Sequence, residues 1–172
     1  APDGAPSTPG RLLLAPVPTA RWAHYGDDLL TTLKYTGKTN EQFTALLVNL
    51  ALAASQRGFD AVRAGERVRL LDPVSGRGTT MNQALMLGLD AMGVETQGKD
   101  VEIYLGFIRQ YLRDHRIKHR SDAVTLRRGP GRDRPARRVT VTILRPDPAG
   151  GRREQVLDII EDDTARVRDH AK

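Results

Sequence analysis

The sequence predicts an α/β fold from three features of residues 68–95: an apolar run that ends at a proline, a glycine loop, and a helix followed by a second apolar run. The apolar run 68–71 is expected to form a strand. This strand must end at Pro73, which has no backbone N–H and restricts the residue before it. Gly76 and Gly78 then permit a tight loop whose backbone can approach a ligand closely.

The second half of this unit is a helix and a buried strand. Thr79 or Thr80 can cap a helix that extends over about residues 81–87. The apolar run 91–94 follows as a second strand and is succeeded directly by Glu95. Glu95 lies near the spacing of roughly 20 residues from the glycines at which an acid reaches the ribose hydroxyls of a nucleoside cofactor. The unit therefore predicts a βαβ nucleotide site.

The loop sequence narrows the choice of cofactor. A dinucleotide site uses G-x-G-x-x-G to place a pyrophosphate on a helix N-terminus, whereas this loop has G-x-G-T-T after Asp72. Asp72 would repel a pyrophosphate but can accept hydrogen bonds from an ammonium group, which favours the methionine portion of S-adenosylmethionine. A P-loop is excluded because Gly-Lys-Ser/Thr is absent. A structural glycine turn in an unrelated α/β protein stays open as the alternative.

The motif Asp72-Pro73-x-x-Gly76-x-Gly78-Thr79 resembles the first cofactor motif of class I methyltransferases. The resemblance is to the branch that contains tRNA guanosine methyltransferases and amino-group DNA methyltransferases, and it covers about residues 25–172. It implies a Rossmann-like sheet with helices on both faces. It also implies an S-adenosylmethionine-dependent methyltransferase that acts on an amino group of a base in RNA or DNA.

A second block, residues 34–42, strengthens the resemblance. It precedes an apolar helix and resembles the segment that crosses the methionine end of the cofactor in this branch. In that interpretation Lys34 and Lys38 can face a carboxylate. In the simpler interpretation, Thr39 or Asn40 is the N-cap of an ordinary helix.

A third strand is expected over residues 155–160, followed directly by an acidic tip. In the family an Asp at this location accepts a hydrogen bond from the adenine amino group, and Asp163 is the best match. Asp163 can equally cap a helix over 165–171, and the two roles are compatible. The resemblance thus implies these cofactor-binding residues: Lys38, Thr39, Asn40, Asp72, Pro73, Gly76, Gly78, Thr79, Glu95 and Asp163.

Residues 109–138 are strongly basic, with eleven Arg or Lys against three Asp, in a chain whose net charge is +6. An amphipathic helix is expected over 101–112, followed by strands at 123–126 and 139–144 that form a basic hairpin insertion over about 121–146. Arginine presents planar donors to phosphate and releases counterions from a polyanion, so contact with nucleic acid is predicted. The candidates are Arg127, Arg128, Arg132, Arg134, Arg137 and Arg138. A solubilising loop is the alternative, since no aromatic residue interleaves the basic run.

One feature of such an enzyme is absent from the sequence. The family holds the acceptor amino group with Asp/Asn-Pro-Pro-Tyr or a near relative after a fourth strand, and no such tetrapeptide occurs in the 172 residues. The catalytic residues are therefore unknown, and only the first three strands of a seven-stranded sheet are predicted. In the family's sheet the strand of the glycine loop is central, so the strand at 68–71 is expected to be left at an edge here. We expect that the domain requires a missing C-terminal half or a homo-oligomer partner. A non-catalytic module that binds nucleic acid or protein is the alternative function.

Composition limits the remaining classes. The absence of cysteine excludes disulfides and thiolate chemistry. His115 and His119, expected at helical spacing on one helix, lie among Arg and Lys residues that would repel a cation, so no metal is predicted. Residues 1–24 are expected to be a flexible lead rich in Pro, Gly and Ser. Without an apolar run long enough for a membrane span, or a signal peptide, a cytoplasmic location is expected.

Overall fold

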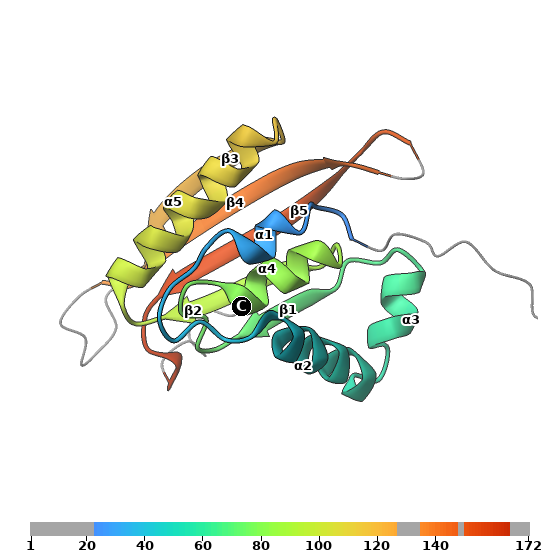
Figure 1. Ribbon diagram of the computed structural model, residues 1–172, viewed down its shortest axis with the longest axis horizontal. Coiled ribbons are helices and arrows are strands. Elements are labelled where there is room, and N and C mark those ends of the chain that lie inside the picture. The colour runs from blue at the N-terminus through green and yellow to red at the C-terminus, as the bar shows by residue number, and fades with distance from the viewer. Residues whose placement is uncertain (1–22, 127–134, 148–149, 166–172) are drawn as a thin grey trace, which may run out of the picture.

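The computed structural model describes residues 23–126, 135–147 and 150–165 (Figure 1). Its strands form one five-stranded sheet in the order β1-β2-β5-β4-β3. The strands are β1 (Arg69–Asp72), β2 (Asp90–Glu95), β3 (Lys118–Thr125), β4 (Arg137–Pro146) and β5 (Arg152–Glu161). The α/β class predicted from the sequence is therefore confirmed.

The sheet is mixed. Strands β1, β2 and β5 run parallel, whereas β4 is antiparallel to both β5 and β3. The carboxyl ends of the three parallel strands therefore meet at one edge, which is where ligands bind in open α/β sheets. As the strand count predicts, β1 is an outer strand of the sheet, with β2 as its neighbour on one side.

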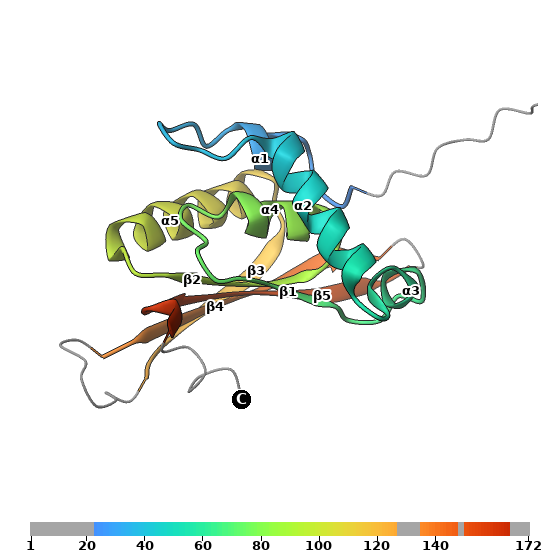
Figure 2. The ribbon, with the colours of Figure 1, turned by 90° about the horizontal axis from the view of Figure 1, so that it is seen from below.

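The main helices form a layer on one face of this sheet, and one short helix, α3 (Gly58–Arg63), lies beside the sheet (Figure 2). The others are α1 (Asp28–Thr31), α2 (Glu41–Ala54), α4 (Thr79–Met86) and α5 (Gly98–Asp114). Helices α1, α4 and α5 lie over the sheet, and α2 packs against α4 beside β1. The two parallel crossovers both step in the same direction across the sheet, so their common handedness returns both helices to the same face. In the described residues, helices are thus not found on both faces as the resemblance implied.

The main core lies between the helical layer and the sheet. Helix α5 buries Val101, Leu105, Ile108 and Leu112, which recur at helical spacing on one side of the helix. These residues belong to the same cluster as apolar strand residues such as Val141. The predicted amphipathic helix is therefore confirmed, and its apolar side fixes α5 over β2, β3 and β5.

A chain of hydrogen bonds connects three helices inside this core. Tyr104 of α5 donates to Asn82 Oδ1 of α4 at 2.8 Å, and Asn82 Nδ2 donates to the carbonyl of Leu29 in α1 at 3.0 Å. Burial raises the pKa of the Tyr104 hydroxyl, which therefore remains a protonated donor. Because buried polar groups cost free energy unless they are bonded, this chain specifies how the three helices meet.

The opposite face of the sheet carries a charged cluster on its middle strands. Asp158 of β5 is fully buried and accepts hydrogen bonds from Arg138 at 2.7 and 3.1 Å and from Thr140 at 2.6 Å. The hydrogen bond to Asp158 raises the pKa of the Arg138 guanidinium. A small apolar cluster around Ile160 lies on β2 and β5. Complete pairing is what allows a carboxylate to remain buried here.

The basic hairpin is confirmed, but its first strand begins earlier than predicted. β3 pairs with β4 from Lys118 opposite Leu144 to Thr125 opposite Arg137. Helix α5 ends at Asp114, and Arg116 adopts a left-handed φ of 55° that turns the chain into β3. The prediction that the two histidines share a helix is therefore wrong, because His115 caps α5 and His119 lies on β3. The predicted lead over 1–24 lies almost entirely outside the described residues, as does most of the helix expected over 165–171.

Candidate functional site

The glycine loop joins the carboxyl end of β1 to the start of α4. Its first turn forms because Asp72 Oδ1 accepts a hydrogen bond from the Val74 N–H at 3.0 Å. Ser75 then donates its N–H to the carbonyl of Val94 at 2.9 Å, which attaches the loop to β2, and Gly78 donates to the carbonyl of Ser75 at 2.8 Å. The loop is therefore held by backbone bonds on the β2 side.

The two glycines of the motif have different roles. Both have positive φ, 51° at Gly76 and 79° at Gly78. A Cβ atom at Gly78 would lie 2.5 Å from Cζ of Tyr104, so this glycine allows the loop to pack against α5. A Cβ atom at Gly76 would meet nothing within 4 Å. The backbone is thus accessible to a ligand at Gly76, whereas Gly78 is required for packing.

A polar pocket of about 360 Å³ lies over this loop and is called the loop pocket below. Its residues come from three separate parts of the chain: Tyr35, Thr36, Gly37 and Thr39 from the second sequence block; Asp72, Val74, Ser75, Gly76, Arg77, Thr79 and Thr80 from the glycine loop and α4; and Asp100 from α5. Tyr35 and Thr79 approach each other directly, with 3.5 Å between their hydroxyl oxygens. The structure thus brings together the two sequence blocks on which the resemblance rests.

Arg77 was not selected from the sequence, yet it is the only cationic side chain that lines the loop pocket in the described part of the chain. Its Nε donates to Asp100 Oδ1 at 2.7 Å, and its guanidinium lies 4.6 Å from the centre of the Tyr35 ring. This arrangement connects the glycine loop to the first turn of α5 and to the second block. A sequence signal existed: an arginine between the two glycines and an acid at the start of the helix that follows the second strand.

The structure places two candidates of the second block in local roles. Asn40 accepts a hydrogen bond from the Phe43 N–H at 3.0 Å, so it is the N-cap of α2. Lys38 Nζ donates to the carbonyl of Leu30 and to Glu41, each at 2.5 Å. The hydrogen bond from Lys38 lowers the pKa of Glu41. Neither Lys38 nor Asn40 lines the loop pocket.

The two candidate acids beyond β1 are also engaged locally. Glu95 Oε2 accepts the Gly76 N–H at 2.9 Å and Oε1 accepts the Gln97 N–H at 2.7 Å. Asp163 accepts the Ala165 N–H at 3.0 Å in an exposed turn. Of the predicted cofactor residues, the loop pocket includes Thr39, Asp72, Gly76 and Thr79 and does not include Lys38, Asn40, Pro73, Gly78, Glu95 and Asp163.

Two of the six arginines predicted to contact nucleic acid lie in the described residues, and both form ion pairs. Arg137 pairs with Glu102 and, at 3.2 Å, with Glu161. Arg138 is held by Asp158 as described above. The other four, Arg127, Arg128, Arg132 and Arg134, lie outside the described residues.

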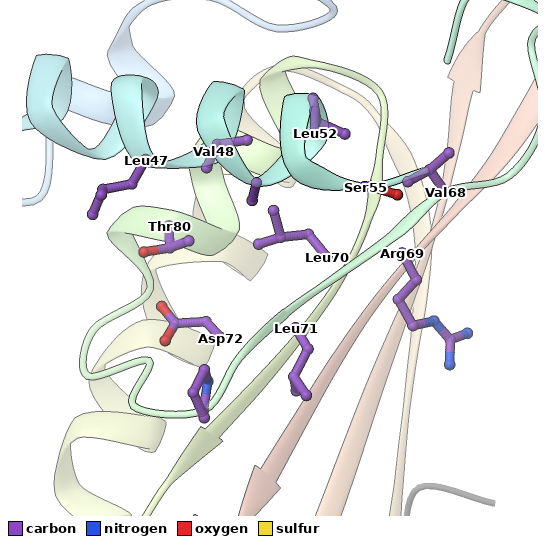
Figure 3. A pocket seen from close by; sticks show the side chains of 12 residues that line it. Leu47, Val48, Leu52, Ser55, Val68, Arg69, Leu70, Leu71, Asp72 and Thr80 are labelled. Atoms are coloured by element: carbon purple, nitrogen blue, oxygen red, sulfur yellow. The ribbon is translucent and has the colours of Figure 1, made fainter. Parts of the chain in front are cut away.

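An apolar groove of about 380 Å³ lies beside the loop pocket, between α2 and the outer strand β1 (Figure 3). Leu70 points from β1 toward Val48 and Leu52 of α2, whereas Leu71 points to the other face of the sheet. Pro73 also lines this groove, and the groove shares Asp72 and Thr80 with the loop pocket. Leu47 and Leu71 of its lining are exposed, as are Phe43, Leu46 and Leu50 elsewhere on α2 and Val74 of the glycine loop. The open side of β1 is thus both unpaired in the described sheet and apolar.

No family model, curated protein or solved structure matches this chain. Across the described residues, no helix is both long and apolar enough to cross a membrane. The same part of the chain contains no group of three His, Cys, Asp or Glu side chains placed to hold a metal ion. The function is therefore inferred from the geometry of the site.

Proposed function

We propose that the loop pocket binds S-adenosylmethionine and that the protein is a methyltransferase acting on an amino group of a base in RNA or DNA. The observation that carries this proposal is the meeting of residues 35–39 with the glycine loop in one pocket at the carboxyl end of β1. Neither block alone distinguishes a cofactor site from a helix start or a glycine turn. A cofactor site requires the two blocks to meet, whereas an ordinary helix start and a structural glycine turn do not.

The chemistry of the lining residues fits this cofactor. Asp72 provides a carboxylate at the tip of β1 that can accept hydrogen bonds from the ligand's ammonium group. Gly76 leaves the backbone open to close approach. Tyr35, Thr39 and Thr79 provide hydroxyl groups that can donate to or accept from the polar parts of a nucleoside.

The reaction implied by the resemblance is a direct transfer of the methyl group from the cofactor sulfur to an amino nitrogen. The residues of this chain would bind and orient the cofactor, so their contribution to catalysis is positioning. A base within a duplex would have to leave the stack to reach the pocket. The basic hairpin would supply phosphate contacts for such a substrate.

Isothermal titration with S-adenosylhomocysteine tests the cofactor proposal. The variants Asp72→Ala and Gly76→Val should each weaken binding at least tenfold, because they remove the ammonium acceptor and fill the open side of the loop. Gly65→Val is a matched control, since Gly65 has φ 71° but lies outside the loop pocket. Unchanged binding in both pocket variants would rule out this site.

The second candidate function is a non-catalytic module that binds a partner through the same fold. The observation in its favour is the lack of an Asp/Asn-Pro-Pro-Tyr sequence in the 172 residues, together with the apolar groove at β1. A radiolabelled methyl-transfer assay on RNA and DNA, with a protein that carries the chain and any sequence continuous with it, separates the two functions. Transfer that depends on Asp72 would exclude the module.

A further inference from the structure

We propose that Arg77 recognises the carboxylate of the ligand in the loop pocket, and that binding exchanges Asp100 for this carboxylate as the partner of Arg77. The inference rests on the proposed function and goes beyond it by assigning one end of the ligand to one side chain. It predicts the orientation of the cofactor: the amino-acid end lies where Arg77 faces the pocket.

Arg77 has the donors that such a role requires. Asp100 engages Nε, and neither terminal nitrogen of the guanidinium has a hydrogen-bond partner among the described residues. The side chain is 27% exposed, so these nitrogens are accessible without being fully solvated. A guanidinium in this state can form two parallel hydrogen bonds with a carboxylate, the geometry in which arginine binds it best.

The alternatives that the sequence offered for this role are less suitable. Lys38 is already bound to the carbonyl of Leu30 and to Glu41, with a side chain 13% exposed. Lys34 is exposed and does not line the pocket. The charged side chains that do line it are Asp72, Asp100 and Arg77. An amino-acid group carries one ammonium and one carboxylate, which Asp72 and Arg77 complement in charge.

The exchange of partners is physically reasonable because breaking the ion pair between Arg77 and Asp100 requires little free energy. Asp100 lies in the first turn of α5, where the positive end of the helix dipole stabilises a carboxylate without a partner. Tyr35 would keep the guanidinium in place during the exchange, since the cation–π contact does not involve Asp100. Arg77 would therefore be oriented before the ligand arrives.

The test compares two ligands that differ in their amino-acid end, S-adenosylhomocysteine and 5′-deoxy-5′-methylthioadenosine, by isothermal titration with the full chain. For Arg77→Gln we expect at least tenfold weaker binding of S-adenosylhomocysteine and less than a twofold change for methylthioadenosine, which has no carboxylate. Arg77→Lys should recover part of the loss. Arg57→Gln is the control, because it breaks an exposed ion pair with Glu66 and neither residue lines the loop pocket.

The variant Asp100→Asn gives an independent result of opposite sign. It removes the carboxylate that competes for Arg77, so S-adenosylhomocysteine should bind more tightly than it does to the unmodified protein. Weaker binding would show that Asp100 itself holds the ligand or shapes the pocket, and unchanged binding would show that Asp100 does not compete for Arg77. Both results would overturn the exchange. This variant decides the matter if circular dichroism shows that Arg77→Gln does not fold.

The remaining outcomes are also decisive. Equal loss of both ligands in a folded Arg77→Gln variant would mean that Arg77 only maintains the pocket, and unchanged binding of S-adenosylhomocysteine would mean that it has no role. Both results overturn this inference and leave the proposed cofactor intact. Failure of the unmodified protein to bind either ligand would overturn the cofactor proposal and this inference with it.

Discussion

Glu95 accepts a hydrogen bond from the backbone N–H of Gly76 at 2.9 Å, which links the end of β2 to the open point of the glycine loop. The same carboxylate accepts the Gln97 N–H, so both of its oxygens bind backbone donors. Glu95 therefore shapes the loop in this structure, and its contact with the ribose hydroxyls of a cofactor stays a prediction.

We expect Glu95→Ala to weaken S-adenosylhomocysteine binding and to lower the free energy of unfolding by about 1 kcal/mol, because the Gly76 N–H loses its acceptor. Titration calorimetry and urea unfolding measure the two effects. Glu95→Gln, which keeps an acceptor oxygen, should lie between the variant and the unmodified protein. Unchanged affinity of Glu95→Ala for S-adenosylhomocysteine would show that neither the contact of Glu95 with the loop nor a contact with ribose contributes to binding.

We expect Gly78→Val to destabilise the fold by about 2 kcal/mol or more, because its Cβ would overlap the Tyr104 ring and valine disfavours a φ of 79°. Gly76→Val is the matched control, since it has the same positive φ problem but no overlap. Thermal unfolding compares them. Equal melting temperatures would contradict the assignment of Gly78 to packing.

Replacing all six arginines 127, 128, 132, 134, 137 and 138 by Ser should flatten the dependence of log affinity for nucleic acid on log salt. Each phosphate contact that is lost should lower the slope by roughly 0.7 to 0.9. A second variant with only Arg137→Ser and Arg138→Ser separates folding from binding, because these two form ion pairs with Glu102, Glu161 and Asp158. An unchanged slope in the sixfold variant would indicate a solubilising loop.

We expect the isolated chain to dimerise or aggregate. The open side of β1 presents unpaired backbone groups beside exposed apolar side chains of α2, a combination that favours association. Size-exclusion chromatography with light scattering measures this, and Leu47→Glu with Leu71→Lys should shift the chain toward monomer. A well-folded monomer that stays monomeric at high concentration would refute the prediction.

Stability should fall as the pH rises from about 10 to about 12. Burial, followed by the nearby charge of Asp28, raises the pKa of Tyr111 from 10.0 to about 12 in the folded protein. A raised folded pKa gives a contribution that is complete below pH 10 and lost as the pH rises toward 12. Urea unfolding across this range should show a shallower decline for Tyr111→Phe. An equally steep decline would assign the alkaline transition to other groups.

The sequence by itself determined the elements whose signals are local. Pro73 ends β1, the glycines open the loop, and the apolar spacing of α5 marks its buried face, because each signal depends on a residue and its near neighbours. These signals were also sufficient to predict the βαβ unit, whereas the outer position of β1 was predicted from the strand order that the family resemblance implies.

Only the tertiary structure decided the partners of the polar side chains. Arg77 meets Asp100 and Gly78 meets Tyr104 because α5 packs across the start of α4. Glu95 meets Gly76 because β1 and β2 pair in parallel and end side by side. The crossover connections between the parallel strands also place the helical layer on one face of the sheet. No local sequence pattern encodes these connections. Hydrogen bonds and ion pairs depend on distances of a few ångström between segments far apart in the sequence, so they are determined only when the core has packed.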